Sequence, residues 1–217
     1  MACAGANNGN GPDGSYHSPQ ANSTNVLNGQ ITFGAQWSTV NTTVNGAGGD
    51  VIVQSQGAGN VLDLTTFNNT NVDSTQEADS TNIGSTVTAG VSNVNGSVSI
   101  SGTAVCNSTD VSTDPAYTIV KSNQICNAQD PGSEVNAKVA NVGGDVSIAS
   151  TAFGNNYTED TNALAAPTSI HQVNTSQVFG TANATIRNVG GSVAVTGSAI
   201  GNNAQIVHYT DNGQPVQ

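Results

Sequence analysis

The chain repeats itself at intervals of 47 or 48 residues. NVGGDVSIASTAFGNN begins at Asn141, and NVGGSVAVTGSAIGNN begins at Asn188, so nearly the same sixteen residues occur twice. The glycine that precedes a V-x-V or V-x-I run keeps this spacing through four copies: Gly49, Gly96, Gly144 and Gly191. A fixed period of this length is typical of repeat architectures, in which each unit packs against the next. The period therefore limits the fold before any single element is assigned.

Apolar residues share the phase of these glycines. Within each copy they alternate with small polar residues such as Ser99 and Ser147, and a period of two is that of a strand with one buried face. The predicted repeat core has two positions per copy: Val51, Val53, Val98, Ile100, Val146, Ile148, Val193 and Val195.

The expected fold is all-β, a parallel β-solenoid (β-helix). Each unit also holds a second, weaker strand pattern, such as SQVFGTANATI before the last NVGG. We therefore expect about two coils per 47-residue repeat, roughly seven to nine coils in all, and a rod of roughly 40 Å at ~4.8 Å per coil.

The expected organisation has three parts. Residues 1–24 lack the period and are rich in Gly, Asn and Pro, which predicts a flexible N-terminal arm. Residues 25–210 form the repeat domain, with Trp37 as an end cap of the first coil, and residues 211–217 form a C-terminal tail.

Asn and Gly mark the expected corners, because both tolerate a left-handed backbone. The GN pairs at Gly154 and Gly201 are interpreted as corners after a strand. Stacked asparagines can pair their side-chain amides in a ladder. Asn93, Asn141 and Asn188 are the candidates for one such row, two coils apart; the glycines of the corners are Gly49, Gly96, Gly144 and Gly191.

Composition allows two readings. Hydrophobic residues make up 35% and charged residues 8% of the chain, which suits a disordered segment or a repeat with a narrow interior. The regular phase of Val and Ile favours the repeat, since a disordered chain has no reason to keep it.

The charge restricts the partners. A net charge of −11 with three basic residues leaves no basic face for nucleic acid or for an anionic membrane surface. No run approaches the roughly 20 apolar residues of a membrane span. Cys3 is either a lipid-anchor position or a free thiol.

Cys106 and Cys126 are the disulfide candidate. They lie 20 residues apart, close to the length of one expected coil, and stacked coils would bring their backbones within disulfide range. A bridge would indicate an oxidising compartment; two buried thiols are the alternative.

No catalytic, metal or cofactor site is expected. Carboxylate groups such as Glu159 and Asp160 do not recur with the period, so solvated loops are favoured over calcium sites. The histidines are scattered, and no nucleophile motif accompanies them. We therefore expect that the protein is not an enzyme.

The A-x-G-N-N segments at 152–156 and 199–203, with the Gln-bearing strands TSQVFG and SNQIC, resemble the curlin repeat of bacterial curli fibres. The sequence departs from that repeat at Ala152 and Ala199, where curlin has Gln. The Val-rich NVGG strands and acidic loops are more similar to the secreted surface proteins that anchor holdfasts in stalked alphaproteobacteria. This resemblance implies a secreted or outer-membrane-associated cell-surface protein that works beside curlin-like subunits and a secretion partner.

The function we expect is structural. An extracellular structural or adhesive subunit, a fibre or holdfast-anchoring part, would assemble with its own copies through the solenoid ends and could contact extracellular polysaccharide. A carbohydrate- or ice-binding face is the alternative; it predicts a row of exposed aromatics or threonines, and the four tyrosines do not share a phase. A polysaccharide-degrading enzyme would need a pair such as Glu159 and Asp160 in one cleft.

Overall fold

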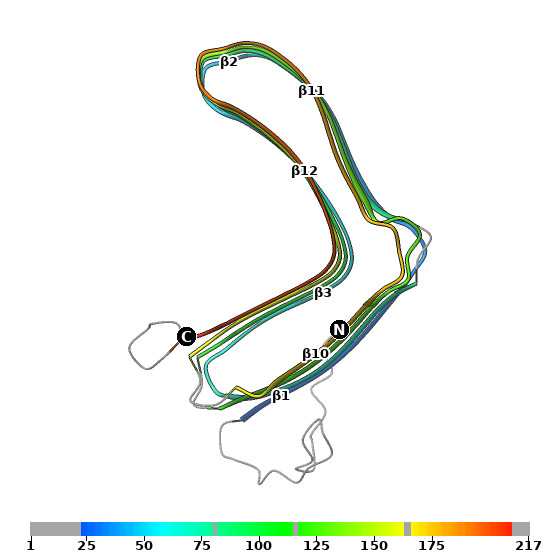
Figure 1. Ribbon diagram of the computed structural model, residues 1–217. Helices are drawn as coiled ribbons and strands as arrows, with labels where there is room; N and C mark the ends of the chain where they lie inside the picture. Colours follow the sequence, from blue (N-terminus) through cyan, green and yellow to red (C-terminus); the bar gives the residue numbers. More distant parts are fainter. Residues whose placement is uncertain (1–22, 80–81, 115–116, 163–165, 210–217) are drawn as a thin grey trace.

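The computed structural model describes residues 23–79, 82–114, 117–162 and 166–209. In these ranges the chain forms twelve strands in three four-stranded parallel sheets, ordered β1-β4-β7-β10, β2-β5-β8-β11 and β3-β6-β9-β12 (Figure 1). The strands are β1 (Ser23–Phe33), β2 (Gln36–Ala47), β3 (Val51–Thr66), β4 (Asn69–Asp79), β5 (Ile83–Val94), β6 (Val98–Thr113), β7 (Thr118–Cys126), β8 (Gly132–Val142), β9 (Val146–Thr161), β10 (Thr168–Asn174), β11 (Phe179–Val189) and β12 (Val193–His208). The predicted parallel β-solenoid is confirmed.

The expected two coils per repeat are wrong, because each repeat is one coil of three strands. Val98 pairs in register with Val51 on one side and Val146 on the other, so equivalent residues of adjacent repeats are direct neighbours. The described chain thus forms four stacked coils, not seven to nine. At ~4.8 Å between strands, the outer coils lie about 14 Å apart, well short of a 40 Å rod.

The wrong number of coils per repeat is explained by a shift in the alternation of buried residues inside the longest strands. In β9 the buried positions follow even numbers from Val146 to Gly154 and odd numbers from Asn155 to Thr161. After this one-residue shift the other face of the strand is buried, so the two halves of the strand pack against different sheets. The GN pairs at Gly154 and Gly201, which were predicted as corners, therefore lie inside continuous strands. The same shift occurs beside Cys106 in β6.

Each coil therefore has a bent outline with two arms (Figure 1). The valine arm lies between the β2-β5-β8-β11 sheet and the first halves of β3, β6, β9 and β12. The amide arm lies between the β1-β4-β7-β10 sheet and the second halves of the same long strands. The two arms meet at an elbow, where Ala78, Ile83, Cys106, Cys126 and Ala128 form a small buried cluster.

The valine arm holds the largest apolar core. Its buried residues are Val51, Val53, Val87, Ala89, Val91, Val94, Val98, Ile100, Val135, Ala137, Val139, Val142, Val146 and Ile148. Because the coils stack in register, each valine or isoleucine packs against the equivalent residue of the next coil, and small β-branched side chains fill the narrow interior. Burial of each such side chain stabilises the fold by ~1.5–3 kcal/mol. A chain with few large apolar residues can fold for this reason.

Val193 and Val195 do not belong to the buried core, contrary to prediction. They pair in register with Val146 and Ile148, but their side chains are 50% and 44% exposed. They lie in β12, the last strand of its sheet, with no further coil stacked on them in the described chain. The open side of β12 leaves them exposed, whereas Val51 and Val53 in β3, the end strand on the other side of the sheet, are buried.

The tip of the valine arm is a corner built on left-handed residues. Asn93, Asn141 and Asn188 have φ of 56°, 56° and 55°, and Gly46 takes the equivalent place in the first coil with φ of 83°. The predicted amide row is present, but it joins adjacent coils: Asn141 donates to Asn93 at 2.9 Å and Asn188 donates to Asn141 at 3.0 Å.

The predicted corner glycines lie in the same turn. A Cβ on Gly96, Gly144 or Gly191 would collide with the turn of the coil below, whereas Gly49, in the first coil, has open space there. Asp50 and Asp145 accept the backbone N–H of Ser97 and Ser192 at 2.8 and 2.7 Å. Close coil stacking thus explains both the glycines and the alternation of Asp with Ser.

The predicted arm and tail fall largely outside the described residues. Residues 1–22 and 210–217 are not described, and the first strand already begins at Ser23, two residues inside the segment predicted as the arm.

Candidate functional site

The two ends of the coil stack are open strand edges. β1, β2 and β3 at one end, and β10, β11 and β12 at the other, pair with a strand on one side only. An edge strand presents a row of backbone donors and acceptors that can pair with another chain. The ends are therefore the first candidates for an interaction surface.

A glutamine ladder runs through the amide arm from end to end. Each glutamine donates its amide to the side-chain oxygen of the glutamine one coil earlier. The distances are 2.8 Å for Gln76 to Gln30, 2.9 Å for Gln124 to Gln76 and 2.8 Å for Gln172 to Gln124. Each amide also donates to a backbone carbonyl of the facing strand, namely Val61, Ser108, Asn156 or Asn203 for Gln30, Gln76, Gln124 and Gln172.

An asparagine ladder beside the elbow runs in the opposite direction. Each asparagine donates to the one in the next coil, at 2.8 Å for Asn60 to Asn107, Asn107 to Asn155 and Asn155 to Asn202. The first three also donate to the carbonyls of Glu77, Ile125 and Val173. The glutamine ladder was not predicted, although Gln76, Gln124 and Gln172 keep a 48-residue period in the sequence that indicates it.

The opposite directions make the two ends complementary. A coil added beyond Asn202 and Gln172 would receive a hydrogen bond from the asparagine and return one to the glutamine. Asn60 and Gln30 in the first coil carry these two groups in the matching places. The first coil of a second copy therefore fits the last coil of this one.

The elbow contains the predicted disulfide pair. Cys106 and Cys126 are bonded, with their Cα atoms 5.8 Å apart and both side chains fully buried. They belong to β6 of the second coil and β7 of the third, and they face each other across the interior instead of lying on neighbouring strands of one sheet, as direct stacking would require. The bond links the bend of β6 to the end of β7.

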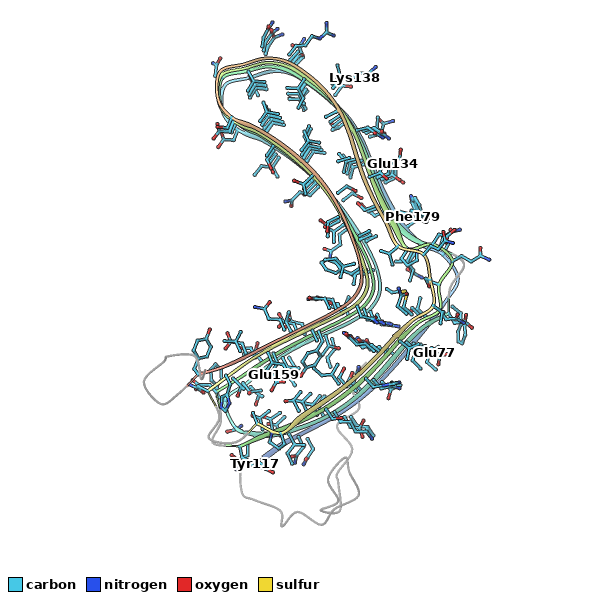
Figure 2. The ribbon with its side chains drawn as sticks, viewed as in Figure 1. Glu77, Tyr117, Glu134, Lys138, Glu159 and Phe179 are labelled. Atoms are coloured by element: carbon cyan, nitrogen blue, oxygen red, sulfur yellow. A yellow bond between two sulfur atoms is a disulfide. The ribbon has the colours of Figure 1, made fainter. Side chains whose placement is uncertain are left out.

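Glu159 is buried rather than in a solvated loop. Its carboxylate lies inside the amide arm (Figure 2), where it accepts hydrogen bonds from Tyr157 at 2.7 Å and Thr168 at 2.8 Å. Burial, and then the Glu159 carboxylate, raise the pKa of Tyr157 above its usual range. Asp160 is exposed on the opposite face of the strand, so the two carboxyl groups do not share a cleft.

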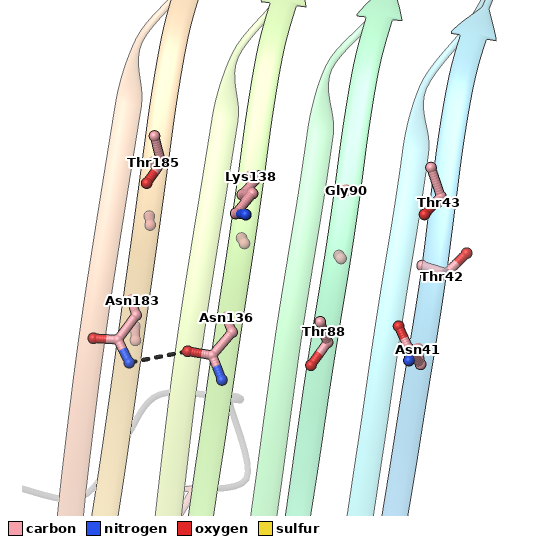
Figure 3. A pocket seen from close by; sticks show the side chains of 13 residues that line it. Asn41, Thr42, Thr43, Thr88, Gly90, Asn136, Lys138, Asn183 and Thr185 are labelled. Carbon is pink, nitrogen blue, oxygen red and sulfur yellow. Dashed lines mark hydrogen bonds between the residues drawn. The ribbon is translucent and has the colours of Figure 1, made fainter.

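A shallow depression of about 510 Å³ crosses the outside of the valine arm (Figure 3). Outward rows from four neighbouring strands line it, with Gly90 leaving a gap between Thr43 and Lys138. The other labelled side chains are Asn41, Thr42, Thr88, Asn136, Asn183 and Thr185. Its surface is open and mixes polar side chains with alanines.

The comparisons with known proteins point to one family. The sequence model described as holdfast attachment protein D matches residues 70–216, well over half of the chain. The chain belongs to the holdfast attachment protein D family. No curated protein and no solved structure matches it.

The holdfast attachment protein D match begins in β4 and so covers the second, third and fourth coils. Membership confirms the predicted resemblance to holdfast anchors and identifies a holdfast-related protein associated with the cell surface. The likeness to curlin repeats stays a prediction.

Neither a metal-binding cluster nor a membrane-spanning helix occurs among the residues that the structure describes. Within the four described ranges, no three His, Cys, Asp or Glu side chains gather where they could hold a metal ion. Over the same ranges, no helix is both long and apolar enough to cross a bilayer.

Proposed function

We propose that this member of the holdfast attachment protein D family is an extracellular structural subunit that stacks end to end with further copies of itself. Each added copy would continue the three sheets across the junction. The observation that carries the proposal is the match between the two ends, in both strand edges and side-chain amides.

The exposed valines of the last coil support this assembly. Val193 and Val195 face the interior of the valine arm, yet about half of each side chain is exposed. In the inner coils the equivalent Val146 and Ile148 are buried. Stacking a first coil on β12 would bury the two valines beside Val51 and Val53, and apolar burial is the main driving force for association.

The proposal places the protein outside the cell and gives it no catalytic role. A buried disulfide suits an oxidising compartment. Glu159 is buried and Asp160 is exposed on the opposite face of the strand, so this pair does not form the two facing carboxyl groups of a glycan-degrading enzyme. Curlin-like subunits are a further proposed partner, since a parallel strand edge can accept any chain with a matching register.

The test compares two lysine substitutions in the same strand. Val195→Lys puts a charge into the interior side of the last coil, where it would have to be desolvated in a stack. Thr196→Lys puts the same charge on the exposed outer face and is the matched control. Light scattering over a concentration series, with electron microscopy of the same samples, measures assembly.

We expect wild type and Thr196→Lys to form species whose mass grows with concentration, and Val195→Lys to remain monomeric with an unchanged circular dichroism spectrum. A wild-type protein that stays monomeric up to millimolar concentration would contradict end-to-end stacking. So would assembly of Val195→Lys at the wild-type concentration.

A further inference from the structure

An aromatic residue occupies the same outward position in the first and last strands of one sheet. Trp37 of β2, Gly84 of β5, Gly132 of β8 and Phe179 of β11 are partners in register. Trp37 is 53% exposed and Phe179 48% exposed. We call this row, Trp37–Gly84–Gly132–Phe179, the aromatic strip.

The tryptophan lies flat on its glycine neighbour. A Cβ on Gly84 would collide with the six-membered ring of Trp37, so the ring occupies the space above that strand. One face of the ring is thus against the backbone, and the exposed half of the side chain is directed to solvent. Gly132 has only ordinary contacts around its missing Cβ, the nearest ring residue being Phe179, so the strip between the two aromatics is level.

The next outward row supplies hydrogen-bonding groups. Thr39, Thr86, Glu134 and Thr181 are register partners two residues further along the same strands, and the three other than Thr86 are exposed. The Glu134 carboxylate is held in place by Asn136, which donates to it at 2.7 Å. Figure 2 shows Phe179, Glu134 and Lys138 following one another along this outer face.

We propose that the aromatic strip binds a neutral polysaccharide chain that lies parallel to the solenoid axis. Aromatic faces beside a few fixed polar groups are the chemistry that receives the apolar faces and the hydroxyls of sugar rings. The rows repeat every ~4.8 Å, close to the length of one sugar unit in an extended chain, and the two aromatics are separated by about 14 Å.

Charge selects a neutral ligand. The chain carries a net charge of −11, and the one ionisable group in the two rows is Glu134. An acidic polymer would be repelled by this field. Along β8, Lys138 lies about 20 Å from the strip, beyond the Debye length of ~8 Å at physiological ionic strength, and so does not offset the repulsion there.

This inference goes beyond the proposed assembly and does not depend on it. A single copy contains the complete strip, so binding can be measured at concentrations where the protein is monomeric. A strip that binds no glycan leaves the stacking experiment unaffected, and a protein that never stacks leaves the strip unaffected.

The tryptophan gives a direct readout. Trp37 is the single tryptophan of the chain, so its fluorescence reports this site without another contribution. The probes are hexasaccharides of β-1,4-linked glucose and of β-1,4-linked N-acetylglucosamine, with hexagalacturonate as the acidic comparison. We expect at least one neutral probe to change the emission of Trp37 saturably, and hexagalacturonate to leave it unchanged.

Two glycine substitutions test the location. Gly132→Thr adds an outward side chain in the middle of the strip without a steric conflict, and Gly90→Thr adds the same side chain in the depression. We expect Gly132→Thr to weaken binding at least tenfold, Phe179→Ala to weaken it several-fold, and Gly90→Thr to bind as the wild type does. Thermal unfolding of each variant establishes that it is folded.

Three outcomes would overturn the proposal. They are the absence of any emission change with both neutral probes at millimolar concentration, binding of hexagalacturonate in their place, and unchanged affinity in a folded Gly132→Thr variant.

Discussion

Gln124 donates its side-chain amide to Gln76 at 2.9 Å, and both side chains are fully buried. The same nitrogen lies 3.0 Å from the carbonyl of Asn156 on the facing strand, and Thr109 donates to the oxygen of Gln76 at 2.9 Å. Buried amides stabilise a fold when they are hydrogen-bonded and cost free energy when they are not. The amide arm thus replaces part of an apolar core with a connected set of amides.

Removing a glutamine from the middle of the glutamine ladder should lower the free energy of unfolding more than removing the glutamine at its end. Gln124→Leu leaves Gln172 without its acceptor and removes a donor from Gln76 and Asn156, all within the interior. We expect a loss of at least about 2 kcal/mol in the free energy of unfolding. Gln172→Leu lies in the last coil, where water can replace the missing group, and should cost less than half as much. Urea unfolding of both variants measures the difference; equal losses would contradict the connected ladder.

Alkaline pH should destabilise the fold through Tyr157. Its pKa is raised in the folded state, first by burial and then by Glu159, whereas it is ~10 in an unfolded chain. Above pH ~10 the unfolded chain therefore binds fewer protons than the folded one, so stability is full below that pH and falls as pH rises.

The test compares wild type with Tyr157→Phe. The variant should lose about 1.5–3 kcal/mol at pH 7, because Glu159 loses a buried donor, but its stability should decline less steeply above pH 10. Urea unfolding at pH 7, 9, 10 and 11 gives both slopes. Parallel curves for the two proteins would mean that Tyr157 ionises as freely when folded as when unfolded.

Removing the disulfide should destabilise the elbow. Cys106 and Cys126 close a loop of 20 residues from the bend of β6 to the end of β7, and a bond across such a loop contributes about 3 kcal/mol. We expect Cys106→Ala with Cys126→Ala to lower the free energy of unfolding by this amount. The control is the wild-type protein unfolded in the presence of a reductant, which keeps the two cysteines reduced in the unfolded chain. Its free energy of unfolding should match that of the double variant. No change in either measurement would contradict a structural role for the bond.

The corner asparagine should prefer glycine to alanine as its replacement. Asn141 has φ of 56°, a conformation in which a Cβ costs about 1–2 kcal/mol. Both replacements lose the hydrogen bond to Asn93, so Asn141→Ala should be about 1 kcal/mol less stable than Asn141→Gly. At Asn136, inside β8, the order should reverse, since glycine weakens a strand. If the Gly and Ala variants had the same order of stability at both positions, the left-handed conformation of Asn141 would not explain the effect.

The repeat period predicted much of the fold. Equivalent valines such as Val98 and Val146 are stacked in parallel register, as their shared phase indicates, and Asn93 and Asn141 form the expected amide row. The number of coils could not be predicted in the same way. The phase shift beside Cys106 sends one strand into two layers, and sequence alone does not distinguish such a bend from a corner.

The disulfide and the aromatic strip were predicted less well from the sequence than the fold was. The pairing of Cys106 with Cys126 was predicted, but from two directly stacked strands, whereas the cysteines lie in different sheets and face each other across the interior. The aromatic strip was not predicted, because Trp37 and Phe179 are far apart in the chain. Their register partners in the two strands between them are glycines, so the aromatic residues do not repeat with the period.

The sequence by itself determined the strand phase, the in-register stacking and the left-handed corners, because alternation, period and Asn or Gly act over a few residues or between identical copies. Tertiary structure alone decided how many strands make a coil, which valines lie at an open end, and that Glu159 is inside. These depend on which layers the bent strands bring together, and a side chain's burial is set by neighbours that its local sequence does not name.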